Sequence, residues 1–140
     1  MKRRYCVAVA VLLSLAAQGC GGSGLDRQNL YGRVTYKGEP VPFGSIAFRP
    51  DRSKGGKGPA GFAQIVEGEY STKSSGKGSV TGPVIVMIEG QVANKPLSPA
   101  LFPTYKTSID VTPDTDELDF DVPETDPNEA ASSKRRGRSR

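Results

Sequence analysis

The chain has 140 residues, with two cysteines, no tryptophan and no histidine. Because histidine is absent, the chain alone cannot supply a Ser-His-Asp or Cys-His catalytic site, and two cysteines do not make a zinc site. Three of the 19 basic residues lie in the first four positions and five in the last seven, so residues 20–133 hold 11 basic against all 15 acidic residues. This mildly acidic middle argues against a nucleic-acid-binding domain, which would carry its basic patch on the fold itself.

The first nineteen residues have the order of charge and hydropathy that is typical of a secretory signal. A basic head at residues 2–4 precedes an almost wholly apolar run at residues 5–17, and small residues stand before Cys20. That run of 13 residues is shorter than the ~20 residues that a membrane-spanning helix needs, which disfavours a transmembrane anchor. We therefore expect a signal peptide over residues 1–19.

The predicted cellular location of the protein depends on Cys20. The segment AAQGC at residues 16–20 resembles the lipobox of bacterial lipoproteins, in which the cysteine is acylated and becomes the new N-terminus. Cys6 lies in the part that would be removed, so the mature chain would have one cysteine and no internal disulfide. A nucleophilic role for Cys20 would need a base to form the thiolate, and the absence of histidine argues against it.

We expect Cys20 to be lipidated and to bind the bilayer, with residues 20–28 as a lipidated tether rich in glycine. The protein would then be exported and membrane-anchored, on the periplasmic or cell-surface face. Ala17 and Gln18 stand where the lipobox usually has leucine and a small residue. The alternative is a soluble secreted protein with an ordinary cleaved signal peptide.

Residues 29–122 predict one all-β domain, since short apolar runs alternate with turn signals and helical periodicity is absent. In chain order we expect strands near residues 30–36, 44–49, 60–66, 69–73, 84–88, 109–111 and 118–122. Leu30, Val34 and Tyr36 should face inward in the first strand, and Ile46 and Phe48 in the second. The run at 84–88 is the most apolar of the mature chain and predicts a central strand covered on both sides.

Turns and loops should separate these strands. The turns are expected at residues 37–39 and 67–68, and the loops at residues 50–59, 74–81 and 91–107. The loop at 91–107 contains three prolines together with apolar residues, so it is a candidate contact surface, as are the edges of the sheet. Residues 123–140 are polar and end in SSKRRGRSR, which predicts a disordered basic tail.

The segment YGRVTYKGEPVPFGSIAFRPD at residues 31–51 resembles the opening hairpin of carboxypeptidase regulatory-like, transthyretin-like β-sandwich domains. The closing stretch FPTYKTSIDVTPDTDELDFDV, residues 102–122, is similar to small planctomycete-type lipoproteins built on this domain. The resemblance implies an Ig-like or transthyretin-like antiparallel β-sandwich of about seven strands. It also implies a non-catalytic accessory domain, because the family is named after a module that contains no peptidase site.

No catalytic, cofactor-binding or metal-binding residue is assigned from the sequence. The glycine-rich segments at 55–58 and 76–78 lack the spacing of a phosphate-binding loop and are expected to be plain loops. The acidic residues between 114 and 124 could bind calcium, but they alternate with Leu118, Phe120 and Val122 as on the solvated face of a strand.

The expected function is that of a non-enzymatic envelope module with a structural or binding role, whose partner is an unidentified envelope protein or polymer. The alternative is a calcium- or glycan-binding accessory domain that serves a partner enzyme. The basic tail is either a solvated C-terminus or a segment that binds anionic lipid, cell-wall polymer or nucleic acid.

Overall fold

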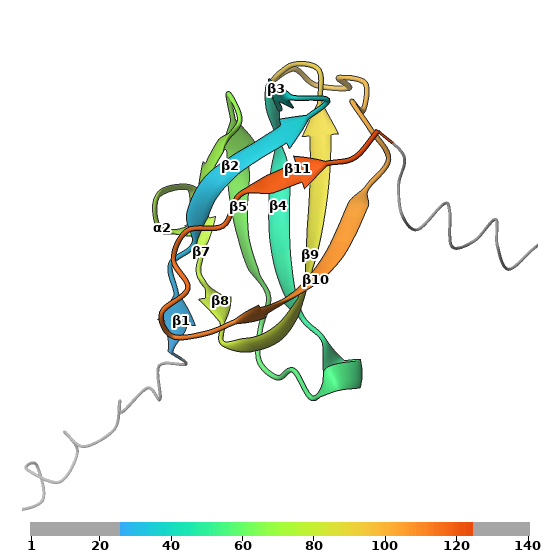
Figure 1. The fold of residues 1–140 in the computed structure, drawn as a ribbon. Coiled ribbons are helices and arrows are strands. Elements are labelled where there is room, and N and C mark those ends of the chain that lie inside the picture. Colours follow the sequence, from blue (N-terminus) through green and yellow to red (C-terminus); the bar gives the residue numbers. More distant parts are fainter. Residues whose placement is uncertain (1–25, 125–140) are drawn as a thin grey trace, which may run out of the picture.

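A computed structural model describes residues 26–124 of the chain (Figure 1). The predictions for the signal peptide and for Cys20 concern residues outside this range, as does the prediction for the tail except at residues 123 and 124. Within it, the chain is mostly β-structure, as expected from the short apolar runs and frequent turn signals. The only helices among the described residues are the short η1 (Arg52–Lys54) and α2 (Thr72–Ser75), and no helix there is long and apolar enough to cross a bilayer.

The strands follow one another in the order β1 (Arg27–Gln28), β2 (Tyr31–Tyr36), β3 (Glu39–Pro40), β4 (Phe43–Pro50), β5 (Gly61–Val66), β6 (Glu69–Ser71), β7 (Gly76–Lys77), β8 (Ser79–Val80), β9 (Gly82–Gln91), β10 (Tyr105–Val111) and β11 (Phe120–Val122). One continuous sheet has the order β10-β9-β4-β5-β6-β2-β11, and β3 and β7 pair with its members at the side. A small separate sheet joins β1 to β8.

The large sheet curls so that β2 and β11 cross in front of the wall formed by β4, β5 and β9 (Figure 1). The pairs in this sheet are antiparallel except for β11, which runs parallel to β2. The expectation of a wholly antiparallel arrangement is therefore wrong at this pair. The chain leaves β10, crosses to the start of β2 at the bridge between Tyr31 and Glu117, and then runs in the same direction as β2.

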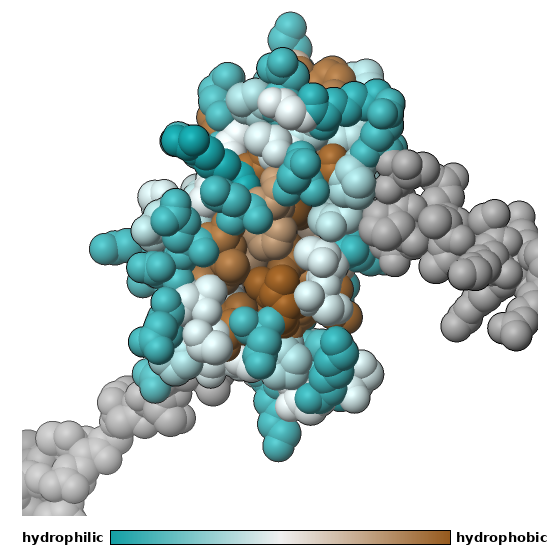
Figure 2. Space-filling view, viewed as in Figure 1, coloured by the Kyte–Doolittle hydropathy of each residue, from teal (hydrophilic) through white to brown (hydrophobic). Residues whose placement is uncertain are grey.

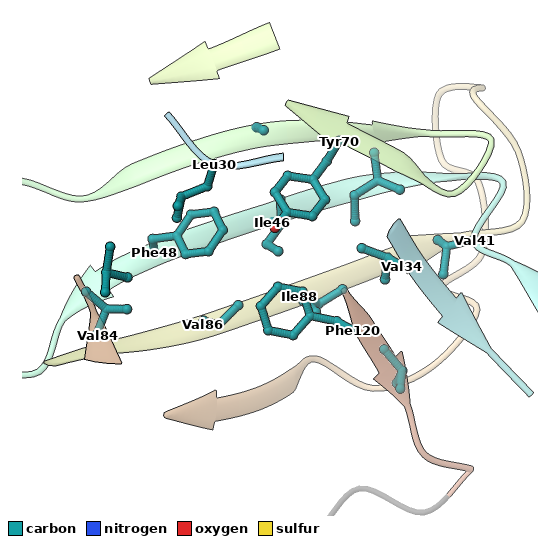
Figure 3. Close-up of a cluster of buried hydrophobic side chains, with 14 of the residues drawn as sticks. Leu30, Val34, Val41, Ile46, Phe48, Tyr70, Val84, Val86, Ile88 and Phe120 are labelled. Carbon is teal, nitrogen blue, oxygen red and sulfur yellow. The ribbon is translucent and has the colours of Figure 1, made fainter. Parts of the chain in front are cut away.

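The core lies between the inner face of the wall and the crossing strands (Figure 3). Period-two alternation places Ile46 and Phe48 of β4 on this inner face, where both are fully buried. Phe48 contacts Tyr70 at 6.1 Å between ring centroids, and Tyr70 in turn lies 6.3 Å from Phe120. Burial of each such large side chain contributes about 1.5–3 kcal/mol, so these contacts favour the crossed arrangement of the strands.

Most of the inward residues expected from the sequence are confirmed, including Leu30, Val34, Ile46 and Phe48. Tyr36 is only partly buried and packs at the margin of the core.

Strand β9 is less buried on its outer face than the sequence predicts. It is central, between β10 and β4, and its buried residues include Val84, Val86 and Ile88. Ile85 and Met87 alternate with them and are only half-buried, so the described residues cover the outer face of β9 only in part. The prediction that residues 84–88 are covered on both sides is therefore wrong.

Two tight turns have the chemistry that the sequence predicts. Lys37 and Gly38 have φ values of 55° and 79° between the paired β2 and β3, and Glu67 and Gly68 have 50° and 79° between β5 and β6. Positive φ at both central residues is the geometry of two-residue hairpin turns that match the twist of the strands.

Several of the expected boundaries differ in the structure. The strand expected at 69–73 stops at Ser71 and gives way to α2, because Thr72 turns inward and its hydroxyl accepts a 2.9 Å hydrogen bond from the backbone N–H of Leu30. The loop expected at 74–81 contains β7 and β8, which pair with β5 and β1. The loop expected at 91–107 ends earlier, since β10 begins at Tyr105 opposite Ile88.

Candidate functional site

The outer face of the sheet holds the most distinctive surface of the described residues. An open hollow of about 550 Å³ lies there, between the wall and the loop that follows β4. Its lining comes from β4, that loop, β9 and β10: Arg49, Pro50, Arg52, Gly58, Pro59, Ala60, Ile85, Met87 and Lys106. The half-buried Ile85 and Met87 of β9, which face away from the core, are therefore part of this hollow.

The lining of the hollow combines apolar residues with three cationic side chains. Ile85 and Met87 contribute apolar surface from β9, and the Nη1 atom of Arg49 lies 3.7 Å from the Sδ atom of Met87. Arg52 and Lys106 add two further positive charges, and the lining contains no carboxylate. This arrangement fits a ligand that has both an anionic group and an apolar part.

The loop that carries Arg52 is held by a compact set of hydrogen bonds. The backbone N–H of Asp51 donates to the carbonyl of Pro83 at 2.8 Å, and its carboxylate accepts from the backbone N–H and the hydroxyl of Ser53 at 3.1 and 2.5 Å. The hydroxyl of Ser53 holds the pKa of Asp51 below its ordinary value. A Cβ atom at Gly56 would lie 2.6 Å from the carbonyl oxygen of Pro83, so this close approach requires glycine.

None of the three cations of the hollow is neutralised by an ion pair among residues 26–124. The ion pair found there joins Lys37 to Glu124 at 2.7 Å, elsewhere on the surface. Arg49, Arg52 and Lys106 are exposed, so their charges remain available to a ligand at the surface.

The hollow adjoins the place where the chain enters the fold. The Nη1 atom of Arg27 in β1 donates to the carbonyl of Gly78 at 2.6 Å and to that of Ala60, in the lining, at 3.3 Å. Gly58, also in the lining, is close enough to Val80 of β8 that an added Cβ would lie 3.0 Å from its side chain. The first described residues therefore lie at the rim of the hollow.

A second surface lies where the curled sheet is open. Figure 2 shows apolar surface in the middle of the face toward the viewer, framed by polar side chains. The side chains that pack on the core yet stay partly exposed are Tyr36, Leu101, Tyr105, Ile109 and Leu118. In the proline-rich loop, Leu97 is wholly exposed, whereas Phe102 is buried and its ring is tilted against that of Tyr36 at 4.9 Å between centroids.

The acidic residues near the C-terminal end serve the sheet itself. A carboxylate oxygen of Asp119 accepts a 2.7 Å hydrogen bond from the backbone N–H of Arg33, and Asp121 accepts one of 2.8 Å from the hydroxyl of Thr35. Both acidic residues are exposed, as the alternation with apolar residues predicts. Within residues 26–124, no three Asp, Glu, Cys or His side chains gather as a metal site would require.

The lipidation residue predicted from the sequence, Cys20, lies outside the described residues. Of the two glycine-rich segments, residues 55–58 contribute Gly58 to the lining of the hollow, and residues 76–78 form β7 and its link to β8. The hollow cannot be predicted from the sequence, because Arg49, Arg52 and Lys106 come from segments that only the fold brings together. The local signal for it is the excess of basic residues in PDRSKGGKGP, residues 50–59.

Comparison with protein-family models, with curated protein sequences and with solved structures finds no significant match to this chain.

Proposed function

We propose that the protein is a membrane-anchored, non-catalytic lipoprotein of the cell envelope, whose transthyretin-like β-sandwich domain acts as a structural or binding module. The observation that carries the proposal is the sequence at residues 16–20, where Gly19 and Cys20 follow a basic head and an apolar run of signal-peptide length. The lone mature cysteine supports acylation, because an exported chain has no internal disulfide partner for it.

The geometry of the described domain is compatible with a short tether. Asp26 lies six residues after Cys20, so the two Cα atoms are at most about 20 Å apart. Strand β9 alone, with ten residues, is about 33 Å long. An anchor at Cys20 would therefore keep the β1 end of the domain close to the membrane.

The partly exposed apolar side chains near β10 and the fully exposed Leu97 are the surfaces on which an envelope partner would bind. Strand β10 pairs only with β9 among the described strands, so it is an edge to which an extended segment could add. The calcium-binding alternative has less support, because Asp119 and Asp121 already accept hydrogen bonds that hold β11 beside β2.

The anchor is tested by fractionating a bacterial host that expresses the full chain, its Cys20→Ala variant and its Cys6→Ala variant. We expect the full chain and Cys6→Ala in the membrane fraction after a high-salt wash, which releases proteins held by charge alone, and Cys20→Ala in the soluble exported fraction. Stable anchoring needs two or more acyl chains, all of which would be attached through Cys20. Retention of Cys20→Ala on salt-washed membranes at the level of the full chain would refute the lipoprotein proposal.

A further inference from the structure

We propose that the hollow beside β1 binds the headgroups of anionic phospholipids and thereby orients the domain on the membrane. The proposal rests on the proposed function, since it assumes that the chain is tethered at Cys20. It adds a second, non-covalent contact between the protein and the bilayer.

The charge of the hollow matches a phosphate and not a neutral surface. Arg49, Arg52 and Lys106 line it without a carboxylate among the lining residues. Lys54 and Lys57 extend the same loop and are exposed. A phosphodiester is a strong hydrogen-bond acceptor, and guanidinium groups bind it with good geometry.

The apolar part of the hollow matches the region of a lipid below its phosphate. Ile85 and Met87 are half-buried on the outer face of β9, with Pro50 and Pro59 beside them in the lining. A lipid headgroup presents its phosphate to water and its glycerol and first methylenes to the interior. The cationic and apolar lining residues can therefore contact the same lipid.

Because the hollow lies at the end of the domain nearest the proposed anchor, the phosphate that it binds should belong to a membrane lipid. The hydrogen bond from Arg27 to the carbonyl of Ala60 joins the first described strand to the lining of the hollow. A tether of at most about 20 Å from Cys20 to Asp26 holds this end of the domain near the headgroups. Tethering raises the local concentration of lipid at the hollow, so a weak individual contact is sufficient.

The test uses the mature chain, residues 20–140, carrying Cys20→Ser so that no acyl group contributes to binding. Its sedimentation is measured with vesicles of phosphatidylcholine alone and of phosphatidylcholine mixed with an equal amount of phosphatidylglycerol. We expect binding only to the anionic vesicles, weakened by added salt. A triple variant, R49Q/R52Q/K106Q, should bind on the order of 100-fold more weakly, since each basic residue near an anionic surface strengthens binding by about five-fold.

The matched control is R33Q/K73Q/K95Q, which removes the same charge from exposed residues outside the hollow. It leaves the basic residues after position 133 in place, as does the hollow variant, so binding by that tail is equal in both. We expect the control to lose no more than a few-fold in affinity. Equal losses in the two triple variants, or no binding to anionic vesicles, would overturn the proposal.

A site-resolved readout is acetylation of lysine side chains in the presence of each kind of vesicle. Anionic vesicles should protect Lys106, whereas Lys95 should still react; equal reactivity of the two lysines would contradict the proposed orientation. The vesicle assays do not depend on the anchor, because the chain that they use carries Cys20→Ser. If Cys20→Ala is lost from salt-washed membranes but the mature chain does not bind anionic vesicles, the lipoprotein proposal stands and the hollow proposal falls. If Cys20→Ala stays on salt-washed membranes while the vesicle assay succeeds, the lipoprotein proposal falls and binding by the hollow stands.

Discussion

The hydroxyl of Tyr70 donates a 2.7 Å hydrogen bond to the backbone carbonyl of Leu118, which joins β6 to the segment that precedes β11. The same segment is tied to β2 by the bond from the backbone N–H of Leu118 to the carbonyl of Tyr31 at 2.9 Å. Burial raises the pKa of Tyr70, so the hydroxyl keeps its proton and acts as a donor throughout the physiological range. These contacts hold the crossing layer against the core.

Replacement of Tyr70 by phenylalanine should destabilise the domain by about 1–2 kcal/mol, because the carbonyl of Leu118 loses its buried donor while the ring remains in the core. Urea unfolding of the two proteins measures the difference. Tyr105→Phe is the matched control, since its hydroxyl makes no hydrogen bond within residues 26–124, and it should change stability by less than about 0.5 kcal/mol. Equal effects of the two changes would mean that the bond to Leu118 contributes nothing.

Gly32→Ala should be among the most damaging single changes in β2. An added Cβ would collide with the carbonyl oxygen of Leu118, and the parallel pairing of β11 would have to shift. We expect a loss of more than about 2 kcal/mol. Gly38→Ala is the comparison, because it meets only the cost of a positive φ of 79° with no atom within 4 Å, about 1 kcal/mol. A smaller loss for Gly32→Ala than for Gly38→Ala would contradict this packing.

Glu67→Asn should stabilise the domain by about 0.5–1 kcal/mol. Glu67 is exposed and has a φ of 50° in the turn between β5 and β6, a conformation that asparagine adopts more readily. The backbone hydrogen bond from its N–H to the carbonyl of Pro42 at 2.9 Å is kept by either side chain. Thermal unfolding should show a higher Tm; an unchanged or lower Tm would count against the turn geometry.

The stability of the loop beside the hollow should depend on pH through Asp51. Its pKa in the folded protein lies below the unfolded value of about 3.9, so its charge stabilises the fold above about pH 4, and this contribution is lost as pH falls through the folded pKa. Asp51→Asn should therefore be less stable than the unmodified chain at neutral pH, with a difference that shrinks under acidic conditions.

Ser53→Ala provides the second measurement for this loop, because it removes the hydroxyl that donates to Asp51. The variant should show a weaker dependence of unfolding free energy on acid than the unmodified chain. A pH profile identical to that of the unmodified chain would show that this hydroxyl does not lower the pKa of Asp51.

Period-two alternation and turn chemistry were sufficient to predict the all-β class, most of the inward residues of the first two strands and both tight turns. These features depend on neighbours a few residues apart, which is why a sequence reveals them. The parallel pairing of β11 with β2 could not be predicted in this way, because it depends on where the segment after Val111 crosses the sheet. The half-exposed Met87 was likewise missed, since an apolar run does not show which face is covered.

The hollow is a product of the same long-range arrangement. Arg49, Arg52 and Lys106 belong to β4, to the loop after it and to β10, and only the order β10-β9-β4 places them around one surface. The prediction for Cys20 is the opposite case, because the resemblance to a lipobox depends only on adjacent residues.

Anchoring through Cys20 can be measured by mass spectrometry of the N-terminal peptide of protein purified from its native membrane. We expect a mature N-terminus at Cys20 that carries the mass of attached acyl chains. A free N-terminus at any other residue, with Cys20 removed or unmodified, would refute the anchor and would define a soluble exported protein.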